Sequence, residues 1–491
     1  EWNDANNALV GRGLSVVTLA YLRRYLPFVR ELLDGDVTVT PELRERLGTV
    51  LDVLTEHASD DVDDVRRRDV MDALGAAGTA YRERAYAGLT NERVTVSAGE
   101  VRALLDLAED HVESSLHANA RDDALYHSYN ILDLSPGRAA VRYLTEMLEG
   151  QVAVLSSGLL TPEESVALLR SLRSSALYRA DQHSYILYPN RELPSFLGRN
   201  TFSAERAAQC PLVGALAAAG DRSIVVKDVE GNFHFAAHIR NSRSVEEALD
   251  ALSSDANLRR LVERHRDELL ALFEDVFNHA SFTGRSGSFF AFEGLGSIYW
   301  HMVSKLLLAV QETLERAVAE GADATTVEAL RSAYEDVRAG LGYCKTPEVY
   351  GAFPTDPYSH TPAGHGARQP GMTGQVKEEV LTRMGELGLR VEDGQVVIRP
   401  LLLRAEEWTT APATFAYRDV GGAARSIDLP AGSLAFTFCQ VPVVYSRGGD
   451  AVSVTAHLAD GTTADQPDGV LSAELSASIF RREGRVTSLS V

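Results

Sequence analysis

The first seven residues, EWNDANN, combine side chains that suit the cleavage of a glycosidic bond. Two carboxylates, Glu1 and Asp4, flank Trp2 and Asn3. An aromatic wall beside a carboxylic acid raises the pKa of that acid by desolvation, as a general acid requires. The indole can stack on a sugar face, and the amides of Asn3 and Asn6 can bind hydroxyl groups. The alternative is a loop with Asx turns that precedes a helix.

Residues 283–306, TGRSGSFFAFEGLGSIYWHMVSKL, hold further reactive side chains in a run rich in glycine and aromatic residues. If a helix begins within this segment, His301 and Lys305 fall at positions i and i+4 and share one face. The flexible loop before that helix would deliver Glu293 to an aromatic-lined cleft. In the alternative interpretation the aromatic side chains belong to the core and His301 is a buried imidazole with internal partners. The aromatic residues that we expect to bind substrate here are Tyr299 and Trp300.

A stretch rich in proline and glycine, residues 344–375, follows the long helical part of the chain. Proline and glycine at this density exclude a helix, and the aromatic residues indicate an ordered, packed loop. We expect Tyr358 and His360 to contact a substrate. His360 and His365 have no Asp, Glu or Cys at ligand spacing, so no metal site is predicted.

The end of that stretch, GMTGQVKEEV, places Thr373 and Gly374 directly before a predicted helix. Free backbone N–H groups and a hydroxyl at a helix N-terminus form an anion site. The alternative is that Thr373 is an ordinary N-cap.

Helices must position these segments, because apolar residues recur at i, i+3, i+4 and i+7 from Leu14 to about Gly340. Several of the predicted helices have clear start signals. These signals are Thr40-Pro41, Ser97 to Glu100, and Thr161-Pro162-Glu163-Glu164.

Two segments depart from the helical pattern. RSIVVKDVEGNFHFAAHI predicts a β-hairpin near residues 223–238, inserted in the helical body. From Val391 short strands alternate with turn residues, which predicts a small antiparallel β-sandwich at 391–491. The fold class is therefore expected to be mainly α, with a helical catalytic domain at 1–390.

The composition narrows the possible partners and the compartment. A formal net charge of −21 disfavours nucleic acid and anionic membranes. Only four of the 48 basic residues are Lys, which suggests a GC-rich genome. A bacterial source is expected. The three cysteines form no CxxC pair, and no apolar run approaches the roughly 18 residues of a membrane span, so a cytoplasmic protein is expected. The chain does not begin with Met, so a preceding signal peptide is still compatible with this pattern.

These motifs, in this order, resemble the cellobiose phosphorylase family and its relatives. EWNDANNALVGRGLSV resembles that family's Asp-Trp-Asn-Asp-Gly-Met-Asn segment, with a Gly-rich turn and a helix after it. MTGQVKEEVLTRMGELGLRVEDGQVVIRPLLLRAEEW resembles its Thr-Gly pair, helix, Leu-Gly turn and short hairpin. The resemblance covers the start, residues near 300, and 370–408, but not about 30–280.

The resemblance implies an inverting, sugar-active enzyme on an (α/α)6 barrel. It implies that Asp4 or Glu1 is the general acid and that His301, Thr373 and Gly374 bind phosphate. Inorganic phosphate would be the co-substrate, with no other cofactor, and the substrate an oligosaccharide. The resemblance further implies that this chain is the C-terminal part of a longer protein, because the general acid of a six-hairpin barrel lies midway along it. A homo-oligomer is compatible with this interpretation.

The departures from the family pattern leave other functions open. Glu1 replaces an Asp, Ala5-Asn6 replaces Gly-Met, and Glu293 has no counterpart with a known role. If Glu293 activates water, the enzyme is an inverting hydrolase whose carboxylates lie about 6.5–9.5 Å apart. A carbohydrate-binding protein with a degenerate site, or a purely helical interaction scaffold, are the non-catalytic alternatives.

Overall fold

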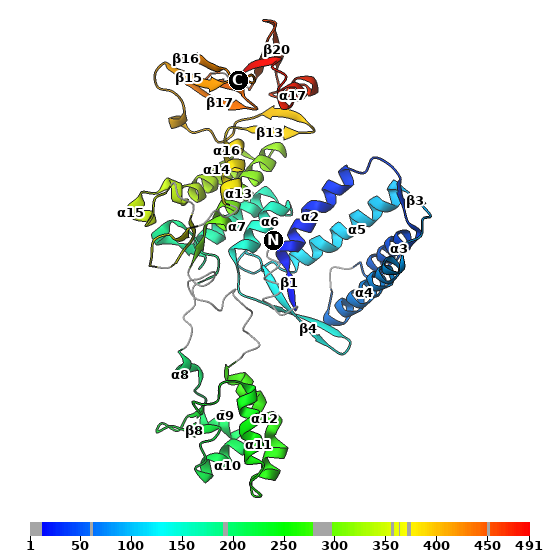
Figure 1. Ribbon diagram of the computed structural model, residues 1–491, viewed down its shortest axis with the longest axis vertical. Coiled ribbons are helices and arrows are strands. Elements are labelled where there is room, and N and C mark those ends of the chain that lie inside the picture. Colours follow the sequence, from blue (N-terminus) through cyan, green and yellow to red (C-terminus); the bar gives the residue numbers. More distant parts are fainter. Residues whose placement is uncertain are drawn as a thin grey trace. The chain divides into compact units, whose positions relative to one another are not determined.

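The computed structural model describes residues 12–58, 62–189, 195–277, 297–354, 358–362, 364–370, 375–448 and 452–491. By its internal contacts the chain divides into two units. We call Ser15–Leu187 with Ser297–Val491 the main unit, and Glu1–Leu14 with Tyr188–Gly296 the insertion unit. Figure 1 labels the helices and several of the strands of both units, and the fold is mainly α, as predicted.

The main unit contains nearly all the long helices that the apolar periodicity predicts. Its helices are α2 (Val16–Glu31), α3 (Pro41–Glu56), α4 (Asp64–Ala87), α5 (Ala98–His117), α6 (Leu148–Ser157), α7 (Pro162–Ser174), α13 (Trp300–Ala319), α14 (Ala324–Ala339), α15 (Pro347–Tyr350), α16 (Gln375–Glu386) and α17 (Ala473–Phe480). Short 3-10 turns lie at Ala180–Gln182, Gly342–Cys344 and Ala405–Glu407.

The predicted start signals cap these helices as expected. Thr40 caps α3, and the side chains of Ser97 and Thr161 begin α5 and α7. In both α5 and α7 the carboxylate three residues later completes a capping box. Each cap satisfies backbone N–H groups that would otherwise lack partners at the helix start.

Helices α2, α6, α13 and α16 pack side by side in that order. Helix α6 is buried along nearly its whole surface, which is typical of a helix enclosed by others. The starts of α2 and α6 meet at Ser128. Its carbonyl accepts from the N–H of Val16 (2.9 Å), and its hydroxyl accepts from the N–H of Gly150 (2.9 Å).

The starts of α6 and α13 meet in the same way at Leu187. Its carbonyl accepts from the N–H of Leu148 (3.0 Å), and its own N–H donates to the carbonyl of Ser297 (3.1 Å). Farther along, Gln311 of α13 donates to the carbonyl of Thr382 in α16 (2.9 Å). The four helices therefore run parallel and begin at one end of the unit. Helices α5 and α14 pack against α2 and α13 in a second layer. A closed (α/α)6 barrel remains a prediction.

Short antiparallel strands connect the helices of the main unit. They are β2 (Val37–Val39), β3 (Val94–Val96), β4 (Tyr129–Ser135), β5 (Arg138–Tyr143), β6 (Tyr178–Arg179), β7 (Ser184–Tyr185), β10 (Ile298–Tyr299), β11 (Tyr358–Thr361) and β12 (Arg368–Pro370). The strand β1 (Gly13–Ser15) ends at the first residue of the main unit. The three strands β10, β11 and β12 form one sheet, and β10 continues directly into α13.

The C-terminal part is built from strands, as the alternating pattern predicts. They are β13 (Leu389–Glu392), β14 (Gln395–Ile398), β15 (Ala413–Arg418), β16 (Ala424–Leu429), β17 (Ser433–Phe438), β18 (Val441–Ser446), β19 (Val454–Leu458), β20 (Thr463–Gln466) and β21 (Val486–Ser490). A five-stranded sheet in the order β17-β18-β21-β19-β20 packs with α17 around an apolar core. The pairing differs from the prediction at one point, because β18 and β21 run parallel.

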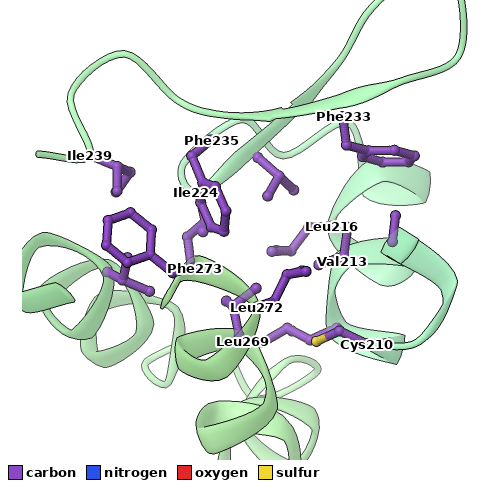
Figure 2. Close-up of a cluster of buried hydrophobic side chains, with 14 of the residues drawn as sticks. Cys210, Val213, Leu216, Ile224, Phe233, Phe235, Ile239, Leu269, Leu272 and Phe273 are labelled. Atoms are coloured by element: carbon purple, nitrogen blue, oxygen red, sulfur yellow. The ribbon is translucent and has the colours of Figure 1, made fainter. Parts of the chain in front are cut away.

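The insertion unit has a hydrophobic core of its own (Figure 2). Its elements are α8 (Phe196–Arg199), α9 (Ala204–Ala208), α10 (Pro211–Ala219), β8 (Val225–Lys227), β9 (Phe233–Phe235), α11 (Ser242–Leu252) and α12 (Arg259–Phe277). The side chains that meet in Figure 2 include Cys210, Leu216, Ile224, Phe235, Leu269 and Phe273. The predicted hairpin is present as β8 and β9, and Gly231 at its tip has a φ of 95°, which favours glycine.

The internal contacts mark a longer segment around the predicted hairpin. The sequence predicts an inserted hairpin near 223–238, and the segment Tyr188–Gly296 that contains it makes most of its contacts within its own unit. The predicted boundary at 390 stays a prediction, because the contacts divide the chain after Leu187 and before Ser297.

Candidate active site

The predicted site residues that the structure describes lie in the sheet formed by β10, β11 and β12 and at the start of α13. Pairing of β10 with β11 sets Tyr299 opposite His360. Because β10 continues directly into α13, the first residues of the helix lie beside the same sheet. The residues brought together are Tyr299, Trp300, His301, Tyr358 and His360.

Tyr299 connects the two histidines. Its ring stacks on His360 with centroids 4.8 Å apart and planes at 17°. Its hydroxyl lies 3.2 Å from Nδ1 of His301. Burial lowers the pKa of His360 to about 4, and its Nδ1 lies 2.8 Å from the hydroxyl of Ser359. His360 is therefore neutral at physiological pH and can offer a hydrogen bond but no charge.

Trp300 supports the site from within the core. It is 0% exposed, and its indole N–H donates to Oγ1 of Thr361 (2.9 Å). The ammonium of Lys345 lies 4.7 Å from its ring, and the ring of Tyr350 meets it edge-on. Tyr358 is half-buried and also meets Tyr350 edge-on. Direct contact of Trp300 with a substrate stays a prediction, and this burial argues against it.

A buried carboxylate of α16 faces the same end of α13. Oε2 of Glu378 lies 3.5 Å from Nε2 of His301, and Glu378 is 4% exposed. Lys305, one turn beyond His301, is 8% exposed. Burial lowers the pKa of His301 and lowers that of Lys305 to about 8, while the charge of Glu378 raises both values. The charge of Glu378 thus acts on both His301 and Lys305, as expected for two residues that share one face of a helix.

A second buried carboxylate lies at the start of α6. Glu149 is 2% exposed, and Oε2 of Glu149 accepts from the hydroxyl of Tyr129 (2.9 Å). The pKa of Tyr21, on α2, is raised by burial and further by the charges of Glu149 and Glu378. The starts of α2, α6, α13 and α16 therefore surround one group of buried polar side chains.

The sequence patterns missed Glu378 and Glu149. The buried face of α16 is polar, because Gln375, Glu378, Thr382 and Glu386 are buried while Val376, Val380 and Leu381 are exposed. A search for apolar stripes selects the opposite face of such a helix. The sequence signal that could have identified Glu378 was the helical spacing of these polar residues directly after Thr373-Gly374.

The remaining predicted residues lie outside the described part of the chain. They are Glu1, Trp2, Asn3, Asp4, Asn6, Glu293, Thr373 and Gly374. Helix α16 begins at Gln375.

The described arrangement suits the binding of a polar ligand with an anionic group. Parallel helix starts favour negative charge, and His301 and Lys305 add cationic or hydrogen-bonding groups beside them. Among the described residues, no group of His, Cys, Asp or Glu has the geometry of a metal site. Glu378 and Glu149 are buried carboxylates among the described residues at these helix starts.

A family model described as "GH149 phosphorylase insertion domain 2" matches residues 193–280. The matched range falls within Tyr188–Gly296, the self-contained part of the insertion unit. No curated protein matches the chain. The match supports a relationship with glycoside phosphorylases, and it does so in a part of the chain that the motif resemblance does not cover.

Within the described ranges, every helix is too short or too polar to cross a membrane.

Proposed function

We propose that this chain belongs to an inverting glycoside phosphorylase that cleaves an oligosaccharide with inorganic phosphate. The observation that carries the proposal is the match of residues 193–280 to a phosphorylase insertion domain. The group of His301, Lys305 and Tyr299 at the parallel helix starts supports it, because an anion would be stabilised there. We expect no further cofactor.

In the proposed reaction Asp4, or Glu1 in its place, donates a proton to the glycosidic oxygen. Phosphate, bound by His301, Thr373 and Gly374, attacks the anomeric carbon from the opposite face. The carbon–oxygen bond to the leaving sugar breaks as the bond to a phosphate oxygen forms. The products are a sugar phosphate of inverted configuration and a shortened saccharide. Tyr299 and His360 would orient the phosphate and the sugar beside it.

The proposal is tested by incubating the full chain with β-linked gluco-oligosaccharides, with and without inorganic phosphate. We expect a sugar phosphate to form when phosphate is present, and Asp4→Asn to abolish its formation. His365→Ala, an exposed loop substitution, is the matched control for surface effects. Absence of sugar phosphate with every saccharide would contradict the proposal.

An inverting hydrolase is the second candidate, and the buried carboxylate of Glu378 is the observation that favours it. A hydrolase needs a base for water, and either Glu293 or Glu378 would serve. Release of sugar without phosphate, lost in Glu293→Gln or Glu378→Gln, would establish this function. In a phosphorylase, Glu293→Gln should leave phosphorolysis partly intact.

A non-catalytic carbohydrate-binding protein makes a different prediction. Calorimetry would then detect saccharide binding without turnover, and Asp4→Asn would leave the affinity unchanged.

A further inference from the structure

A pocket of the main unit lies at the other end of the parallel helices from the candidate active site. It has a volume of about 470 Å³ and is lined by the second half of α2, the ends of α6 and α13, and strand β13. A volume of this size is typical of a small-molecule site. Arg316 in its lining lies about 22 Å along α13 from His301, at 1.5 Å per residue. The pocket is therefore separate from the site at the helix starts.

The lining of this pocket is polar and rich in arginine. Guanidinium N–H groups donate to an anionic group, and carboxylates accept from hydroxyl groups. The lining therefore suits a ligand that carries both kinds of group. Its charged residues are Arg23, Arg24, Glu312, Glu315, Arg316 and Arg390.

Protein partners hold two of the arginines, both on α2. Nε of Arg23 donates to Glu113 (2.9 Å), and Nη1 and Nη2 of Arg24 donate to Glu312 (2.9 and 3.0 Å). Nη1 of Arg23 also donates to the carbonyl of Ser157, at the end of α6 (3.0 Å). This contact compensates the partial negative charge of the helix end, which would otherwise repel an anion.

The other two arginines have donors without acceptors. Nη2 of Arg390 lies 2.5 Å from Glu315, but its Nε is buried and has no hydrogen-bond partner among the described residues. The same holds for Nη2 of Arg316. Burial lowers the pKa of Arg316 by more than the charges of Glu320 and Glu312 raise it. Arg316 is therefore a desolvated guanidinium whose charge is incompletely balanced.

Gly158 keeps the space beside Arg316 open. Its φ is 76°, a left-handed conformation that favours glycine, and it ends α6. A Cβ at this position would lie 3.2 Å from Nη1 of Arg316 and 3.0 Å from Nη1 of Arg23. Gly158 and Arg316 both line the pocket, so no side chain from the end of α6 separates this guanidinium from a ligand there.

We propose that this pocket is a second, non-catalytic site that binds a sugar phosphate. A phosphate monoester has three strong acceptor oxygens and close to two negative charges, which compensate the delocalised charge of Arg316. Glu312 and Glu315 retain lone pairs that accept from sugar hydroxyls. The inference does not rest on the proposed function, although a phosphorylase would produce such a ligand.

The first experiment measures binding by isothermal titration calorimetry. The full chain carries His301→Ala, which weakens binding of the same ligands at the candidate active site. The probes are glucose 1-phosphate, inorganic phosphate and glucose. Because hydroxyl contacts add to the phosphate contacts, we expect glucose 1-phosphate to bind at least about tenfold more tightly than phosphate, and glucose not to bind. Equal affinity for glucose 1-phosphate and phosphate would overturn the sugar phosphate as the ligand.

Substitutions in the pocket locate this binding. In the His301→Ala chain, Arg316→Gln should raise the Kd for glucose 1-phosphate at least about tenfold, and Arg316→Lys should restore part of the affinity. Arg170→Gln removes an exposed arginine of α7 outside the pocket and should leave the Kd unchanged. Ala319→Trp fills the pocket from an exposed position and should abolish binding, so it serves as the test if Arg316→Gln does not fold. An unchanged Kd in Ala319→Trp or in a folded Arg316→Gln chain would overturn the inference.

The second experiment measures the unfolding of the ligand-free chain in urea. Arg316→Gln removes a desolvated charge without a close partner, so the free energy of unfolding should stay equal or rise. Arg338→Gln removes an arginine that is paired with the buried Glu386 and should lower it. An equal loss of stability in the two variants would show that Arg316 stabilises the fold, and would overturn the inference.

These experiments separate the inference from the proposed function. If the wild-type chain forms no sugar phosphate from saccharide and phosphate, the proposed function fails, and calorimetry still decides whether the pocket binds glucose 1-phosphate. If Arg316→Gln lowers the kcat of phosphorolysis, the pocket is not separate from catalysis, and the inference fails while the proposed function stands.

Discussion

The two buried carboxylates of α16 are equally buried and differently satisfied. Glu386 is 3% exposed and accepts from the hydroxyl of Tyr334 (2.9 Å), Nε of Arg338 (2.7 Å) and Nη1 of Arg383 (2.7 Å). Glu378, about two turns earlier, is 4% exposed, and its Oε2 lies 3.5 Å from Nε2 of His301. Two glutamates on one helix thus differ in how closely donors approach them.

The difference separates a carboxylate that stabilises the fold from one whose surroundings are those of a binding site. A buried carboxylate with three strong donors stabilises the fold, and its partners leave it no freedom to interact with anything else. A buried carboxylate beside a histidine and a lysine with lowered pKa values is typical of a functional site. The comparison therefore predicts that substitutions at Glu386 reduce stability, whereas those around Glu378 reduce activity.

The largest expected effect is on folding. Glu386→Ala leaves Arg338 without its buried partner, and the loss of one partner of such a pair costs about 3–5 kcal/mol. Glu378→Gln should cost about 1 kcal/mol or less, because the 3.5 Å separation of Glu378 from His301 is too long for a good hydrogen bond. The free energy of unfolding in urea measures both, and equal losses would remove the distinction between the two carboxylates.

His301→Ala tests the functional end of the same comparison. A hydrogen bond to a charged ligand contributes about 1.5–3 kcal/mol, so the KM for phosphate should rise at least about tenfold. Steady-state kinetics with varied phosphate measure the change, with His365→Ala as the control. A rise confined to the saccharide KM would place His301 on the sugar and not on the anion.

Two tyrosines allow a matched test of smaller size. Tyr299→Phe removes the hydroxyl beside His301 and keeps the stack on His360, whereas Tyr334→Phe removes a donor to Glu386. Each change removes an interaction of about 1 kcal/mol. We expect Tyr299→Phe to raise the phosphate KM about fivefold and Tyr334→Phe to lower the unfolding free energy by about 1 kcal/mol. If Tyr299→Phe instead lowered the unfolding free energy and Tyr334→Phe raised the phosphate KM, the distinction between Glu378 and Glu386 would be refuted.

The smallest effect is expected on the opposite face of α16. Val380 is 56% exposed, so Val380→Thr should change the unfolding free energy by less than about 0.5 kcal/mol and leave kinetics unaltered. A large loss in either measurement would show that this face is covered in solution.

Local signals in the sequence predicted much of the fold. Caps at Thr40, Ser97 and Thr161, and the hairpin turn at Gly231, depend on neighbouring residues and are confirmed. The parallel pairing of β18 with β21 joins distant segments, so no local pattern contains it. The self-contained core of the insertion unit also needs residues as far apart as Cys210 and Phe273.

The candidate site was predicted in part for the same reason. Tyr299, His301 and His360 were selected because aromatic and imidazole groups are conspicuous in sequence. The pairing of β10 with β11 sets Tyr299 opposite His360. The prediction that Trp300 contacts a substrate took no account of its burial, which only tertiary packing determines, and it stays a prediction. Glu378 was overlooked because glutamate in a helix is normally a solvent-exposed residue.

The hydrogen bond between Leu187 and Ser297 has a consequence for the modularity of this protein. The main-unit backbone leaves at Leu187 and returns at Ser297, and these residues are neighbours in space (3.1 Å from N–H to carbonyl). A tight turn could close this gap, and the entropic cost of a longer excursion grows only with the logarithm of its length. A segment between Leu187 and Ser297 can therefore be inserted, deleted or replaced by another while the parallel helices stay packed against one another.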